Sequence, residues 1–85
     1  MSLGLATELS LRSCAVTKLN YAQLLCGLTH LDLSHNHLRS VSGVYCMQRL
    51  KELDVSNNMI TSASPIQHMA CLEIVNLENN GMVKI

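Results

Sequence analysis

The chain has 85 residues with six acidic and six basic side chains, so its formal net charge is zero. Such a short chain allows one domain with a small core, and because Tyr21 and Tyr45 are its only aromatic residues, aliphatic side chains, Met and Cys must fill that core. The sequence contains neither a cluster of Lys or Arg nor an apolar run of the roughly 18 residues that span a membrane, and we expect no nucleic acid or membrane partner.

One pattern, LxxLxLxxNxL, recurs along the chain at a fixed spacing of 22 residues. Three copies begin at Leu28, Leu50 and Leu72, with ordinary aliphatic replacements at some leucine positions. A weaker copy begins at Ala6 and has Cys14 where the others have Asn. A fixed period of this length is typical of a repeat array. It predicts a single domain of about four repeats, at residues 6–27, 28–49, 50–71 and 72–85.

Each copy begins with an alternation of apolar and polar residues that predicts a short strand. Leu31 and Leu33 are two positions apart, so both side chains point into the core while Asp32 between them faces solvent. The corresponding positions in the other copies are residues 9–11, 53–55 and 75–77. The repeats therefore predict short strands that lie side by side in a parallel sheet.

An asparagine follows the predicted strand in three copies, at Asn36, Asn58 and Asn80, and Cys14 takes this position in the first copy. The chain bends here, and its backbone groups lose their partners in the sheet. A buried amide can both donate and accept hydrogen bonds at such a bend. We expect a structural asparagine ladder that Cys14 ends with a weaker donor.

The second half of each repeat has a different spacing. Apolar residues advance by threes from Leu38 through Val41, Val44 and Met47 to Leu50, which predicts a tight turn and a short helical or 3₁₀ segment. Parallel strands joined by such crossovers form a right-handed coil. The predicted fold is an α/β solenoid with a short parallel sheet on its concave face and short helical or 3₁₀ segments on its convex face.

These repeats resemble the leucine-rich repeat superfamily over essentially the whole chain, and their length resembles the class found in regulatory subunits of protein phosphatase 1. The segment from Gln23 to Arg39 is similar to the repeat domain of Rab geranylgeranyltransferase alpha subunits. The resemblance implies a non-catalytic scaffold that binds a protein partner on its concave strand face. The alternative is an accessory or structural repeat segment of a larger protein, such as a Rab geranylgeranyltransferase alpha subunit.

Candidate binding residues are the positions that flank the buried strand leucines, because these point out of the concave face. They form four columns across the strands: Glu8, His30, Glu52 and Ile74; Ser10, Asp32, Asp54 and Asn76; Arg12, Ser34, Ser56 and Glu78; and Ser13, His35, Asn57 and Asn79. Strands about 4.8 Å apart place Asp32 beside Asp54, with Glu52 nearby. We predict a mildly acidic concave centre that prefers a partner with Lys or Arg.

The sequence predicts no enzyme, metal site or cofactor. It has no GxSxG, no HExxH and no glycine loop that could hold a phosphate. Asp32 and Asp54 arise from repetition of one polar strand position and lack an evident pocket for acid–base chemistry. His30, His35 and His37 fall on the strand, at its end and in the turn, so they do not converge as zinc requires.

The cysteines and the chain ends bear on location and assembly. Four widely spaced cysteines without a CxxC pair favour free thiols over disulfides, and the first five residues lack the features of a signal peptide. We therefore expect a cytoplasmic or nuclear protein. Neither end has a recognisable cap, which predicts a fragment of a longer array or end-to-end self-association. The residues available for that association are Leu3, Leu5, Ile74, Met82 and Ile85.

Overall fold

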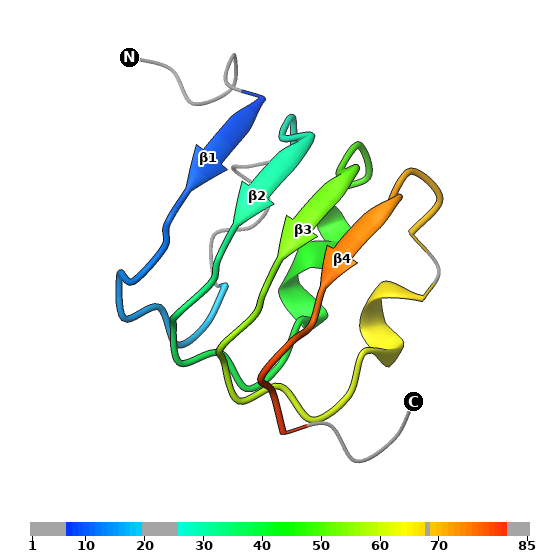
Figure 1. The fold of residues 1–85 in the computed structure, drawn as a ribbon. Helices are drawn as coiled ribbons and strands as arrows, with labels where there is room; N and C mark the ends of the chain where they lie inside the picture. Colours follow the sequence, from blue (N-terminus) through cyan, green and yellow to red (C-terminus); the bar gives the residue numbers. More distant parts are fainter. Residues whose placement is uncertain (1–6, 20–25, 68, 82–85) are drawn as a thin grey trace.

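A four-stranded parallel sheet forms one face of the molecule (Figure 1). The computed structural model describes residues 7–19, 26–67 and 69–81. The strands, in their order across the sheet, are β1 (Glu8–Ser10), β2 (His30–Asp32), β3 (Glu52–Asp54) and β4 (Ile74–Asn76). Each residue pairs with the one 22 positions later, so Leu9 lies beside Leu31 and Leu31 beside Leu53. The predicted parallel sheet is confirmed.

Alternation within each strand sends one side chain inward. Leu31 and Leu53, at the strand centres, are 3% and 2% exposed, whereas the residues before and after them are only half-buried. Backbone pairing continues beyond the strands, because the N–H of Leu33 donates to the carbonyl of Asp54 at 2.7 Å. This regular ladder fixes the concave face as a rigid surface.

The convex side carries 3₁₀ turns where the sequence predicts short helical or 3₁₀ segments. They are η3 (Ser42–Cys46), drawn in green behind β3, and η4 (Ser64–Ile66), drawn in yellow to the right of β4 (Figure 1). The N–H of Val44 donates to Val41, and Ile66 donates in the same way to Ala63, both at 3.1 Å. The predicted return segment at residues 20–25 lies outside the described residues.

Aliphatic layers fill the space between the strands and the 3₁₀ turns. The buried core consists of Leu28, Leu31, Leu33, Leu38, Val41, Val44, Met47, Leu50, Leu53, Val55, Ile60 and Ile66. Partly buried side chains flank it: Leu9, Leu11, Val16, Leu19, Ala63, Met69, Leu72, Val75 and Leu77. All twelve of these buried residues belong to the second and third repeats. In the described part of the chain, no helix is long and apolar enough to cross a membrane.

The asparagine column forms the predicted ladder between repeats. The Asn58 amide nitrogen lies 2.9–3.1 Å from the carbonyl oxygens of Leu33, Val55 and Ser56, and its Oδ1 accepts the Leu38 N–H at 2.9 Å. Asn36 contacts the first repeat in the same way, because its Oδ1 accepts the N–H of Val16 at 2.9 Å. Each amide therefore ties its own bend to the preceding repeat.

Asn80 repeats the contact one unit later, and its Oδ1 accepts the Ile60 N–H at 2.9 Å. Cys14 is exposed, and its Sγ donates to the carbonyl of Arg12 at 3.4 Å. A thiol is a weak donor, so Cys14 contributes a weaker contact at this position than the asparagines of the other repeats.

Candidate functional site

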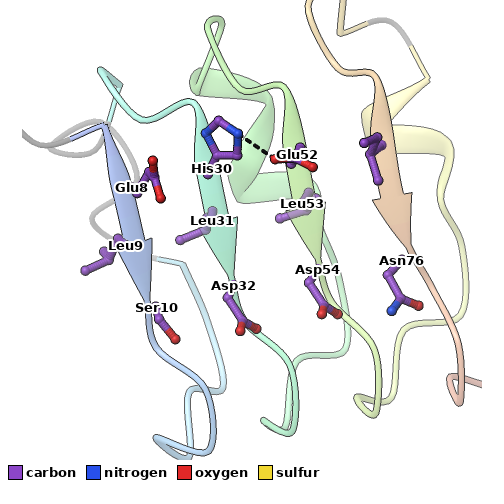
Figure 2. A pocket seen from close by; sticks show the side chains of 11 residues that line it. Glu8, Leu9, Ser10, His30, Leu31, Asp32, Glu52, Leu53, Asp54 and Asn76 are labelled. Atoms are coloured by element: carbon purple, nitrogen blue, oxygen red, sulfur yellow. Dashed lines mark ion pairs between the residues drawn. The ribbon is translucent and has the colours of Figure 1, made fainter.

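A shallow groove of about 410 Å³ crosses the concave face (Figure 2). All four strands line it, because each contributes the residues on both sides of its buried centre. Eight of the predicted binding residues lie on it: Glu8, Ser10, His30, Asp32, Glu52, Asp54, Ile74 and Asn76. The strand centres Leu9, Leu31 and Leu53 also line the groove. We call this surface the concave groove.

The concave groove concentrates negative charge. Glu8, Asp32, Glu52 and Asp54 line it, which is four of the six carboxylates in the chain, and neither Lys nor Arg is present. Ile74 lies at one end with 57% of its surface exposed. The arrangement offers carboxylates beside an aliphatic contact.

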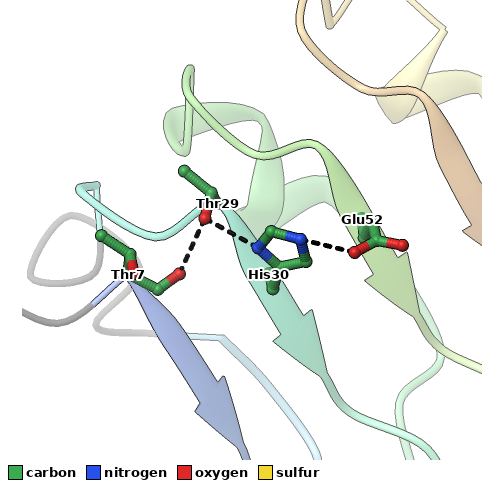
Figure 3. Close-up of polar contacts among 4 residues, drawn as sticks. All are labelled: Thr7, Thr29, His30 and Glu52. Atoms are coloured by element: carbon green, nitrogen blue, oxygen red, sulfur yellow. Dashed lines mark hydrogen bonds and ion pairs between the residues drawn. The ribbon is translucent and has the colours of Figure 1, made fainter.

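His30 is held between neighbouring strands by hydrogen bonds at both ring nitrogens (Figure 3). Its Nε2 lies 2.5 Å from Glu52 Oε2, and its Nδ1 lies 2.8 Å from the hydroxyl of Thr29. The Thr29 hydroxyl is also 3.1 Å from the Thr7 carbonyl oxygen. The Thr29 hydroxyl therefore joins the His30 ring to the Thr7 carbonyl, and together with Glu52 it fixes the orientation of the ring.

Thr29 was not among the predicted site residues. It comes directly before β2, and Thr7 takes the same place before β1. The only sequence signal for the contact between Thr29 and His30 is that a Thr recurs directly before the strand. This pattern does not indicate which group forms a hydrogen bond with the hydroxyl.

Asp32 and Asp54 have a second role in the turns that follow their strands. Asp32 Oδ1 accepts both the N–H and the hydroxyl of Ser34, at 2.9 and 2.6 Å. Asp54 Oδ1 accepts the corresponding groups of Ser56 at 3.0 and 2.7 Å. Asn76 makes the backbone part of this contact without a charge, accepting the N–H of Glu78 at 3.0 Å. An Asn can therefore replace either Asp without losing the acceptor.

Ser34 and Ser56 are buried, although the alternation predicts that they point out of the concave face. They are 1% and 6% exposed. Their hydroxyls turn back to Asp32 and Asp54, because a side chain two residues after an Asp can close a local hydrogen-bonded turn. These serines support the groove and do not line it.

Other predicted residues lie outside the concave groove. Arg12 and Glu78 are exposed beyond the strand ends. His35 and Asn57 lie in the following bends, where both have positive φ near 56°, a conformation that Asn and His adopt more readily than most residues. Asn57 Nδ2 lies 3.3 Å from His35 Nε2, so the two side chains form a row separate from the concave groove.

Of the residues predicted to mediate end-to-end association, one lies within the described part of the chain. Ile74 lies on the concave groove. Leu3, Leu5, Met82 and Ile85 lie outside the described residues.

Local hydrogen bonds set the ionisation of Asp32. Burial raises the pKa of this carboxyl, but the hydroxyl and N–H of Ser34, with the charges of Arg12 and His35, outweigh burial and lower the pKa below its ordinary value of 3.8. Asp32 is therefore ionised at neutral pH.

The lowered pKa predicts that Asp32 stabilises the fold above about pH 4 and that this contribution is lost as the pH falls through its folded-state value. Asp32→Asn keeps the acceptor but does not titrate. The difference in free energy of unfolding between wild type and Asp32→Asn should favour the wild type more at about pH 5 than below about pH 4, because only the wild type loses an ionised carboxylate over this interval. Urea denaturation across this range measures it. A difference that stays constant down to about pH 2 would contradict the prediction.

The described residues show no metal-binding cluster. Within 7–19, 26–67 and 69–81, no group of three or more His, Cys, Asp or Glu side chains is placed to hold an ion. The exposed Cys14 and Cys71 carry free thiols.

Comparisons with known proteins agree with this architecture. The sequence pattern of the leucine rich repeat family matches residues 26–82. A crystal structure of an internalin from Listeria monocytogenes is similar, with a TM-score of 0.85 and 26% identity over 92% of this chain and 23% of the internalin chain. Internalin C2 from the same organism has a TM-score of 0.46 and 22% identity, covering 92% of this chain and 54% of its own.

The structural match covers only part of the internalin, since this chain spans less than a quarter of the first internalin's length. No curated protein matches the chain. The finer resemblances to protein phosphatase 1 regulatory subunits and to Rab geranylgeranyltransferase alpha subunits stay predictions.

Proposed function

The chain belongs to the leucine-rich repeat family, and on that basis we propose that it is a non-catalytic scaffold whose concave groove binds a basic segment of a partner protein. The observation that carries the proposal is the gathering of Glu8, Asp32, Glu52 and Asp54 on one groove without a Lys or Arg among its lining residues. A cationic partner would be attracted to these carboxylates, which raises the association rate and rejects acidic competitors.

The groove is held in shape before any partner arrives. The buried serines fix the Asp32 and Asp54 carboxylates, and Thr29 with Glu52 orients His30. A rigid surface loses little conformational entropy on binding, so even modest contacts can contribute to affinity. The 57% exposed Ile74 adds a contact for an aliphatic side chain beside the charged positions.

The proposal is tested by affinity capture from cell extract, followed by direct binding measurements with the recovered partner. The groove variant is Asp32→Asn/Asp54→Asn, which removes two charges and keeps the turn acceptor that Asn76 uses natively. The control is Glu73→Gln/Glu78→Gln, which removes two charges from exposed residues outside the concave groove. We expect the groove variant to lose about tenfold in affinity and the control less than about twofold.

Equal retention of the partner by wild type and the groove variant would refute binding through these carboxylates. Loss in both double variants would indicate a general charge effect and refute it as well. The wild-type association rate should also fall as salt is raised, because the attraction is screened over about 8 Å at physiological ionic strength. The predicted cytoplasmic or nuclear location stays a prediction.

A further inference from the structure

A second groove, of about 330 Å³, lies where the first and second repeats turn from the asparagine ladder to the back of the solenoid. Its lining residues are Thr17, Lys18, Leu19, Arg39, Ser40, Ser42 and Gly43. We propose that this cationic groove binds a phosphate monoester group. It shares no residue with the concave groove, so the proposal is independent of the function proposed above.

Two cationic residues line the cationic groove. Lys18 and Arg39 are both exposed and come from successive repeats. Among the described residues no Asp or Glu lines the groove, and the one pair of described side chains at ion-pair distance is His30 with Glu52. Both cations are therefore available to an anion from solution.

Hydroxyl groups surround the two cations. Ser40 Oγ accepts the backbone N–H of Ser42 at 3.1 Å. An acceptor role leaves the hydroxyl proton of Ser40 free to donate to a ligand oxygen. Thr17 and Ser42 line the same groove and add further hydroxyls.

The backbone comes close together at the side of the groove. A Cβ atom on Gly43 would lie 2.7 Å from the Cβ of Leu19 and 3.0 Å from its carbonyl oxygen. Glycine therefore allows the second repeat to pack directly against Leu19. This contact fixes the spacing of the two turns that carry Lys18 and Arg39.

The next pair of repeats has the same backbone turn with different chemistry. Twenty-two residues along the chain, Ser40 takes the place of Lys18, and Thr61 takes the place of Arg39. Ser62, which corresponds to Ser40, donates its hydroxyl proton to Ser64 Oγ at 3.1 Å. Two cations and an available hydroxyl are therefore specific to the first turn and are not a by-product of the repeat.

This combination of donors suits a phosphate monoester. Arginine can donate two parallel hydrogen bonds to phosphate oxygens, and lysine adds a compact positive charge. A monoester carries close to two negative charges at neutral pH, whereas a diester carries one. Two cations therefore favour the monoester. A phosphorylated serine in a protein and free inorganic phosphate present the same chemistry to this groove.

The test is a titration of the full 85-residue chain, labelled with ¹⁵N and followed by NMR, at physiological ionic strength. The probes are N-acetylphosphoserine amide, inorganic phosphate and dimethyl phosphate. We expect the amide signals of Lys18, Arg39 and Ser40 to shift with the first two probes. Tighter binding of the phosphoserine derivative would support a protein source, and equal binding would support free phosphate. Dimethyl phosphate should bind about tenfold more weakly than either.

Matched variants give the second part of the test. Lys18→Gln and Arg39→Gln should each weaken binding about tenfold, whereas Lys51→Gln, which removes an exposed cation elsewhere, should change it less than about twofold. Ser40→Ala should weaken binding and Ser62→Ala should leave it unchanged. Circular dichroism of each variant checks that the fold is intact.

Three results would overturn the proposal. The first is the absence of shifts at Lys18 and Arg39 with N-acetylphosphoserine amide and inorganic phosphate. The second is equal weakening by Lys51→Gln, which would reveal a net-charge effect. The third is equal affinity for dimethyl phosphate, which would assign the groove to phosphodiesters such as those of nucleic acids.

Discussion

Asn58→Ala is expected to lower the free energy of unfolding by about 4 kcal/mol, a large part of the roughly 5–15 kcal/mol that stabilises a domain. The change removes the amide that contacts Leu33, Val55 and Ser56, and it removes the acceptor for the Leu38 N–H. Asn58 is 7% exposed, so water cannot easily replace these partners. Each buried polar group left without a partner costs about 1–3 kcal/mol.

Urea denaturation followed by circular dichroism measures this effect. The matched control is Asn80→Ala, which removes the same set of contacts from a half-buried position where water can compensate. Asn58→Asp retains an acceptor for Leu38 but loses the donors, and its cost should remain large because it buries a charge. If Asn58→Ala costs no more than Asn80→Ala, burial does not determine the strength of the ladder.

Leu33→Ala is expected to cost about 3–4 kcal/mol, because it removes a fully buried side chain from the central layer and leaves a cavity. Its neighbours Leu31, Leu53 and Val55 belong to the same core. In a stack of repeats each layer contacts only its neighbours, so a cavity in a middle layer weakens the contacts on both sides.

The control for this prediction is Leu77→Ala, which lies 44 residues later in the same column and is only partly buried. We expect it to cost about half as much as Leu33→Ala, in proportion to the apolar area that it loses. Midpoints from thermal and urea unfolding should rank the two variants in the same order. If the two variants lower the free energy of unfolding equally, the cost does not follow the burial of the leucine, and the prediction is wrong.

The repeat register was sufficient to predict most of the fold. Apolar residues two apart predict strands, apolar residues three apart predict the 3₁₀ turns, and a fixed period aligns both from repeat to repeat. The Asn36 ladder follows from the same logic, since a recurrent amide after a strand must meet the unpaired groups of the bend. The eight groove residues follow because alternation alone determines which face a strand residue occupies.

Tertiary structure decided what those side chains do. Alternation along the strand predicts that Ser34 and Ser56 are exposed. Their hydroxyls instead donate to Asp32 and Asp54, two residues earlier, so local hydrogen bonding overrides the alternation. Whether the Thr29 hydroxyl forms a hydrogen bond with His30 also depends on the rotamers of the two side chains, which the repeat period does not determine.

The concave groove was therefore predictable from the sequence, whereas the cationic groove was not. An acidic surface on adjacent strands appears in the sequence as a column, because strand neighbours share one register. Lys18 and Arg39 occupy different columns, 18 being equivalent to 40 and 39 to 17. They come together because the turn of one repeat packs diagonally against the next, and only the folded backbone, with Gly43 pressed against Leu19, brings them to one groove.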